Sequence, residues 1–157
     1  MIPLSIPGFN TNIQLRNLVL DFNGTLAIDG KLIPGVKKHL IALSKKISIH
    51  VVTGNTFGTA VQELKGIPCK IVLLTSKNQN TEKHEYLLSH DPLSVISIGN
   101  GRNDFLLLKT SAIGIIVIQK EGASVRTLAG ADIICTNILD ALDLINHPLR
   151  LKASLRN

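Results

Sequence analysis

Residues 17–26 read Asn-Leu-Val-Leu-Asp-Phe-Asn-Gly-Thr-Leu, an apolar run that ends at the carboxylate of Asp21 and turns at Asn23-Gly24. A short apolar run bounded by a turn is typical of a buried β-strand, and an Asn-Gly pair is typical of a tight turn. The backbone amides of such a turn can face an anion, and the hydroxyl of Thr25 follows directly. The segment therefore predicts a phosphate-handling site in which Asp21 is the nucleophile.

The rest of the chain alternates short aliphatic runs with longer amphipathic segments. Unbroken aliphatic strands separated by helices indicate a parallel sheet that is covered on both faces. We therefore expect an α/β fold with a doubly wound parallel sheet. The predicted strands span 18–21, 47–53, 70–74, 94–98, 113–118 and 132–135, and the predicted helices span 35–46, 56–65, 80–89, 103–110, 123–129 and 139–146.

The 157 residues are enough for one domain with a real core. Apolar runs at 2–6 and 12–15 flank the turn signal Pro7-Gly8 and predict a hairpin ahead of the core. The polar tail after His147-Pro148 is expected to fray. We divide the chain into an N-terminal hairpin, a core and a tail, at residues 1–16, 17–146 and 147–157.

Composition indicates a cytoplasmic protein without a membrane span. No apolar run approaches the ~20 residues that a spanning helix needs, and the first ten residues do not resemble a signal peptide. Cys69 and Cys135 are far apart and set in apolar surroundings, as expected of free thiols in a reducing compartment.

The formal net charge of +6 could indicate a nucleic-acid partner, but the basic residues are scattered and only five aromatic residues could stack on bases. Lys37-Lys38 and Lys45-Lys46 are separate pairs. A solvated basic surface with a weak attraction for anionic substrates is the better interpretation.

Three further polar clusters fall where predicted strands end or the next helix begins. Thr53-Gly54 offers a hydroxyl and a flexible backbone for phosphate oxygens, and Lys83 offers a cation, although Lys77 lies nearby. Residues 99–104, Gly-Asn-Gly-Arg-Asn-Asp, offer oxygens to a hard cation such as Mg²⁺. Because ligands of doubly wound folds bind beyond the carboxyl ends of the strands, these clusters are expected to meet near Asp21. Thr53-Gly54 and residues 99–104 alone are more often simple turns, and Lys83 alone is most often a solvated helix lysine. It is their order that favours phosphoryl transfer.

From Leu18 to Ile145, the order of these motifs resembles the haloacid dehalogenase superfamily. Its details are most similar to the phosphorylation domain of P-type ATPases, here soluble and free-standing. The resemblance implies that Asp21 attacks phosphorus, that Gly24, Thr25, Thr53, Gly54 and Lys83 bind the phosphoryl group, and that Mg²⁺ is held by Asp21, the Asn23 carbonyl and Asn100, with support from Asp104.

Two residues depart from the pattern of the family's phosphatases. Asn23 stands where an acid protonates the leaving group and activates water, and an amide can do neither. General acid/base catalysis is typically worth ~10²–10⁴-fold, so slow turnover is expected. Asn100 stands where an Asp commonly binds the metal, so weak Mg²⁺ binding is expected. An impaired phosphate-binding regulatory or interaction module is therefore the alternative to a phosphatase or phosphotransferase.

The spacing of the motifs leaves no room for an inserted cap domain. Residues 28–32 read as a small flap hairpin with Asp29-Gly30 as its turn. The site is therefore expected to be open, which suits a macromolecular or small phosphorylated substrate, or a homo-oligomer whose neighbour supplies a lid.

Overall fold

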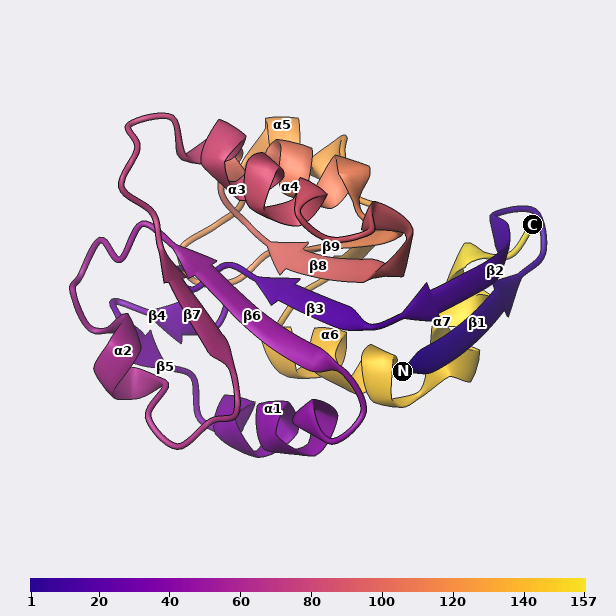
Figure 1. The fold of residues 1–157 in the computed structure, drawn as a ribbon, viewed down its shortest axis with the longest axis horizontal. Coiled ribbons are helices and arrows are strands. Elements are labelled where there is room, and N and C mark those ends of the chain that lie inside the picture. Colours follow the sequence, from indigo (N-terminus) through magenta and orange to yellow (C-terminus); the bar gives the residue numbers. More distant parts are fainter.

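The computed structural model describes residues 1–157, apart from the side chain of Thr11. Six parallel strands form the central sheet in the order β10-β9-β8-β3-β6-β7 (Figure 1). All six predicted strands are present and end within one residue of the predicted positions, which confirms the parallel α/β fold. The strands are β3 (Asn17–Leu20), β6 (Ser48–Thr53), β7 (Lys70–Leu73), β8 (Val95–Gly99), β9 (Ile113–Val117) and β10 (Ile133–Cys135).

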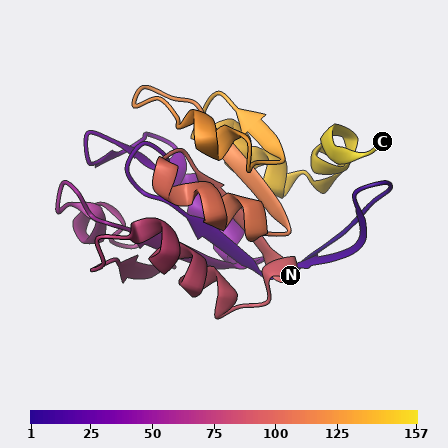
Figure 2. The same ribbon diagram turned by 90° about the horizontal axis from the view of Figure 1, so that it is seen from above.

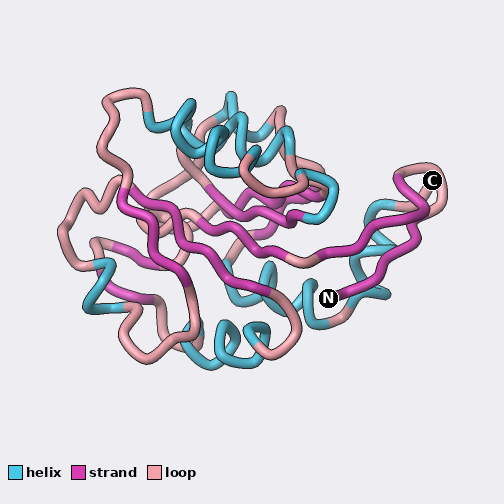
Figure 3. Tube along the Cα trace, viewed as in Figure 1, coloured by secondary structure: helices cyan, strands magenta, loops and turns pink.

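Helices cover both faces of this sheet (Figures 1 and 3). One face carries α1 (Val36–Ser44), α2 (Ala60–Glu63) and α6 (Ile138–Asn146), and the other carries α3 (Gln79–Leu88), α4 (Phe105–Thr110) and α5 (Val125–Leu128). Coverage on both sides explains why the strands are aliphatic throughout rather than alternating. No helix among the described residues is both long enough and apolar enough to cross a membrane.

The predicted helix over 56–65 is wrong in length, since α2 has only four residues. Residues ahead of it form a turn in which the Gly58 amide donates to the Asn55 carbonyl at 2.8 Å. Asn55 and Gly58 both have positive φ, 51° and 69°, which is incompatible with a helix. Helical geometry therefore begins only after Gly58.

The predicted N-terminal hairpin is confirmed as β1 (Ile2–Ile6) and β2 (Asn10–Leu15), which project from one end of the sheet together with α7 (Pro148–Leu155) (Figures 1 and 2). The expectation of a frayed tail is wrong, because the tail forms α7. Leu151 is fully buried and belongs to the same apolar cluster as Ile2, Leu4 and Ile6 of β1. The hairpin would otherwise expose that apolar face to water, so the tail is ordered by burial.

The carboxyl ends of β3, β6 and β8 point away from this hairpin, toward the flap formed by β4 (Ala27–Ile28) and β5 (Lys31–Leu32) (Figure 1). The flap turn is confirmed at Asp29 and Gly30, whose φ values are 50° and 72°. Between Thr25 and Lys83, a stretch described throughout, the chain forms only the flap and elements of the core.

Candidate active site

Asp21 lies at the carboxyl end of β3, which pairs with β6 on one side and β8 on the other. Its backbone amide donates to the Ile98 carbonyl at 3.0 Å, so the sheet register still positions this residue. The Lys83 ammonium lies 2.6 Å from Oδ1 of Asp21 and 2.6 Å from Oδ1 of Asp104. Lys83 is fully buried, whereas Lys77 is exposed. The structure thus brings Lys83, and not Lys77, to Asp21.

The charges of this cluster are unbalanced, with two carboxylates around one ammonium. Burial and the neighbouring Asp104 carboxylate raise the pKa of Asp21 to about 6, against the opposing pull of Lys83. Burial alone would lower the pKa of Lys83, but Asp104 and Asp21 raise it above its ordinary value. Lys83 therefore stays charged, and an additional cation beside Asp21 would be electrostatically favourable.

Thr25 connects Asp21 to the loop after β8. Its hydroxyl lies 3.3 Å from Oδ2 of Asp21 and 3.1 Å from Oδ1 of Asn100. Gly24 permits this approach, because its φ is 78° and a Cβ on it would stand 2.2 Å from Nδ2 of Asn100. The Asn100 amide group in turn donates to the Gly122 carbonyl at 3.0 Å, which directs its oxygen toward Thr25.

Asp104 organises the loop after β8. Its Oδ2 accepts hydrogen bonds from the backbone amides of Asn100 at 3.0 Å and Gly101 at 2.8 Å, while its Oδ1 accepts from Lys83. Gly99 is required beside it, because a Cβ there would come within 2.5 Å of the Asp104 carboxyl carbon. Both oxygens of Asp104 are thus engaged within the protein, which favours a positioning role for this residue.

Thr53 is the last residue of β6 and Asn23 lies in the turn after β3, and no hydrogen bond joins either side chain to Asp21 within the described part of the chain. The Thr53 hydroxyl accepts from the Asn55 amide at 2.9 Å, which shapes the turn at Gly54. The side-chain oxygen of Asn23 is buried and has no hydrogen-bond partner. Such an oxygen is costly unless water, a ligand or a metal completes it.

Oxygen atoms suited to Mg²⁺ are therefore present. Asp21 and Asn100 each direct an oxygen at the Thr25 hydroxyl. Within the described residues, no group of three His, Cys, Asp or Glu side chains is arranged to hold a metal. A hard cation here would accordingly rely on one carboxylate and on amide oxygens, which fits Mg²⁺ but with reduced ligand charge.

Gln119 and Glu121 complete the site and were missed from the sequence. The Gln119 amide donates to the carbonyls of Gly24 at 3.0 Å and Thr25 at 2.9 Å, so it fixes the turn after Asp21. Glu121 accepts from the Asp29 amide at 2.8 Å and thereby holds the flap tip. Only their position just after a predicted strand could have pointed to them.

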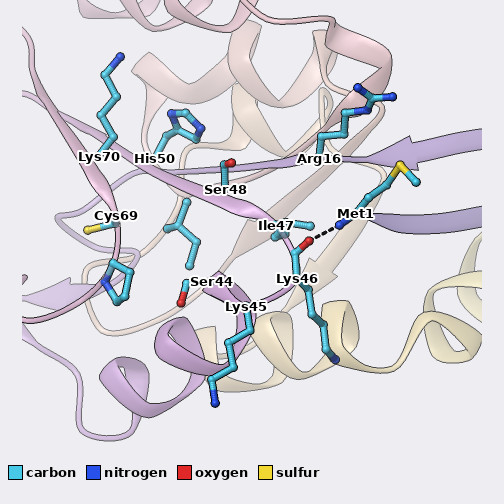
Figure 4. Close-up of a pocket in the computed structure, with 12 residues that line it drawn as sticks. Met1, Arg16, Ser44, Lys45, Lys46, Ile47, Ser48, His50, Cys69 and Lys70 are labelled. Atoms are coloured by element: carbon cyan, nitrogen blue, oxygen red, sulfur yellow. Dashed lines mark hydrogen bonds between the residues drawn. The ribbon is translucent and has the colours of Figure 1, made fainter.

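A groove of about 840 Å³ lies away from the Asp21 cluster, at the amino-terminal ends of β6 and β7. Its rim is basic, but the amino groups of Lys45 and Lys46 point away from its centre (Figure 4). It opens where β6 begins, whereas Asp21 follows the carboxyl end of β3. The groove is therefore separate from the Asp21 cluster.

Comparison with known proteins agrees with this fold. The chain is similar to 3-deoxy-D-manno-octulosonate 8-phosphate phosphatase from Moraxella catarrhalis, solved with magnesium and phosphate ions, with TM-score 0.66, 19% identity and coverage of 85% of this chain and 87% of that one. A putative phosphatase of the same kind from Vibrio cholerae gives TM-score 0.70 at 13% identity, and the match covers 100% of this chain and 98% of that one. A putative haloacid dehalogenase superfamily hydrolase from Legionella pneumophila gives TM-score 0.70 at 15% identity, and the match covers 90% of this chain and 87% of that one. The chain has the haloacid dehalogenase fold.

Sequence comparison finds closer relatives, although no family model matches. The uncharacterised protein MJ0073 of Methanocaldococcus jannaschii is 51% identical over 63 residues, which are 40% of this chain and 68% of that protein. The chain belongs to the same family as this protein. Uncharacterised MJ0072 of the same organism is 41% identical over 39 residues, 25% of this chain and 89% of that protein. The likeness to P-type ATPases stays a prediction.

Proposed function

We propose that this protein is a Mg²⁺-dependent phosphatase or phosphotransferase that forms an aspartyl-phosphate on Asp21. The observation that carries the proposal is the buried Lys83, which contacts both Asp21 and Asp104 at 2.6 Å. A carboxylate held against a fixed cation, at the end of a central strand, is suited to attack a phosphate ester whose negative charge the cation offsets. The Moraxella phosphatase of the same fold, solved with magnesium and phosphate, supports this assignment.

In the first step, an oxygen of Asp21 forms a bond to phosphorus while the bond from phosphorus to the leaving oxygen breaks. Lys83 and the turn at Thr53-Gly54 would bind the phosphoryl oxygens. In the second step, water attacks phosphorus, phosphate leaves, and the Asp21 carboxylate is regenerated. When bound, Mg²⁺ would neutralise charge on the phosphoryl group, and Asp21, Asn23 and Asn100 are the residues that would hold it.

Asn23 makes both steps slow. Its amide cannot give a proton to the leaving oxygen or take one from the attacking water, so solvent has to serve both roles. The absence of this acid/base costs about 10²–10⁴-fold in rate. Slow release suits a phosphoenzyme that persists, as in a phosphotransferase.

A phosphate-binding regulatory module that does not turn over is the second candidate. The observation that favours it is the neutral character of both Asn23 and Asn100, of which Asn100 is hydrogen-bonded through both ends of its amide to Thr25 and Gly122. The open site, without a cap, suits either a small or a macromolecular phosphorylated ligand, and a neighbouring subunit could supply a lid.

Hydrolysis of 4-nitrophenyl phosphate in Mg²⁺ or in EDTA tests the proposal. We expect slow Mg²⁺-dependent turnover by the wild type and none by Asp21→Asn. The matched control is Asp140→Asn, which removes an exposed carboxylate on α6 and is expected to leave turnover unchanged. Undiminished turnover by Asp21→Asn would refute the mechanism, and phosphate binding without any turnover would favour the regulatory module.

A further inference from the structure

We propose that the substrate carries a second anionic group, a carboxylate or a second phosphate, and that Lys77, Arg102 and Arg126 bind it beside the Asp21 site. This inference rests on the proposed function, because it assumes that the group to be transferred lies at Asp21. It assigns these three basic residues to substrate selection.

The three basic side chains line one groove of about 370 Å³. All three are exposed, and no carboxylate lies within 4.0 Å of any of them in the part of the chain that the structure describes. The other residues that line the groove are all neutral amides, namely Asn78, Gln79, Asn80 and Asn103. The groove thus offers three unneutralised cations and several amide donors, which is the chemistry that binds carboxylate and phosphate groups.

The groove directly adjoins the candidate active site. Arg102 lies in the loop between Asn100 and Asp104. Gln79 accepts a hydrogen bond from Asn103 at 2.8 Å, and its amide nitrogen lies where a Cβ on Gly54 would approach within 2.3 Å. Gln79 therefore lies between the groove and the Thr53-Gly54 turn, so the groove and the candidate phosphate-binding turn share this side chain as a wall.

Contacts within the protein hold the groove's walls in place. The Arg126 guanidinium lies 5.0 Å from the centre of the Phe105 ring, a cation–π contact that orders its side chain. The Thr127 hydroxyl donates to the Gly101 carbonyl at 2.7 Å. This bond ties the helix that carries Arg126 to the loop that carries Arg102, so the two cations are presented from connected elements.

The charge of the groove favours a particular class of substrate. A phosphate monoester with a neutral leaving group would be bound at Asp21 and would leave the groove's cations without an anion. A phosphorylated acid or a bisphosphate would place its second anionic group there. The same chemistry is available from a small phosphorylated acid and from a phosphorylated side chain next to an acidic residue of a polypeptide.

Calorimetric titration with two matched esters tests the inference. Glycerol 3-phosphate and 3-phosphoglycerate have the same carbon chain and differ in one carboxylate. In Mg²⁺, we expect the wild type to bind 3-phosphoglycerate at least about 10-fold more tightly, since charge-assisted hydrogen bonds are the strong ones. The double variant Arg102→Gln/Arg126→Gln is expected to lose most of this preference, since only Lys77 remains of the three cations. The control Lys45→Gln/Lys46→Gln, in the groove of Figure 4, is expected to keep the preference.

Equal affinity of the wild type for the two esters, no binding of either, or an undiminished preference in the double variant would overturn the inference. If the double variant does not fold, Lys77→Gln replaces it and is expected to reduce the preference several-fold. A third titration with a phosphoserine peptide, with and without an adjacent aspartate, separates a polypeptide source from a small molecule. Hydrolysis measured in parallel separates this inference from the proposed phosphatase or phosphotransferase function. Selective binding of 3-phosphoglycerate without turnover contradicts only the proposed function. Turnover without a preference for 3-phosphoglycerate contradicts only this inference.

Discussion

Replacing Asn23 by Asp is expected to raise the rate of phosphate-ester hydrolysis by about 10²–10⁴-fold, or roughly 3–5 kcal/mol of activation free energy. The side-chain oxygen of Asn23 is buried and has no hydrogen-bond partner, so a carboxyl group of the same shape fits without displacing an existing bond. Burial raises the pKa of a carboxyl group. Burial therefore favours the protonated form of the new acid, which is the form that can donate to the leaving oxygen.

The assay compares 4-nitrophenyl phosphate with phenyl phosphate, because the more basic phenolate depends more strongly on a general acid. We expect the gain from Asn23→Asp to be larger for phenyl phosphate. Asn23→Ser is the control, since its hydroxyl is polar but far too weak an acid. A gain below about 3-fold, or an equal gain in Asn23→Ser, would refute the reasoning about the missing acid.

Three other changes have expected outcomes. Lys83→Met leaves two buried carboxylates unpaired and is expected to lower the free energy of unfolding in urea by about 3–5 kcal/mol while abolishing turnover. Burial, with the positive charges of His90 and Lys70, lowers the pKa of His50 from 6.5 to about 4. The unfolded chain binds this proton first, so His50 lowers the free energy of unfolding as the pH falls from about 6.5 to 4. We expect the wild type to lose at most about 3 kcal/mol more than His50→Gln over this range, and equal slopes in the two proteins would contradict this. Leu151→Ala is expected to cost about 2–5 kcal/mol and to speed amide exchange in the β1–β2 hairpin, whereas unchanged exchange would show that α7 does not order it.

The strands could be predicted closely because each is an aliphatic run bounded by polar or turn residues, as at Leu18 to Asp21. The helices were less certain. The observed helix α2 is shorter than the helix expected over 56–65, because Asn55 and Gly58 take positive φ, a conformation that the apolar pattern does not reveal. The tail became α7 because Leu151 packs on a hairpin almost a whole chain length away, and such distant burial leaves no local signal.

The site was predictable where residues share one edge of the sheet. Asp21, Asn100 and Asp104 follow neighbouring parallel strands, so their convergence follows from topology. The contacts of Gln119 with the Gly24 and Thr25 carbonyls could not be predicted, since a glutamine that bonds backbone groups of a distant loop belongs to no motif. The position of Lys83 between two carboxylates likewise depends on how α3 packs, which separates it from the nearby Lys77.

Chemical trapping of the phosphoenzyme tests the central claim most directly. After incubation with acetyl phosphate and Mg²⁺, borohydride reduces an aspartyl-phosphate to homoserine, which mass spectrometry of the peptide containing residues 17–26 can locate. We predict homoserine at position 21 in the wild type, with a larger yield than in Asn23→Asp, and no modified peptide in Asp21→Asn. Turnover in the wild type without reduction at Asp21, or trapped phosphate on another residue, would contradict the account.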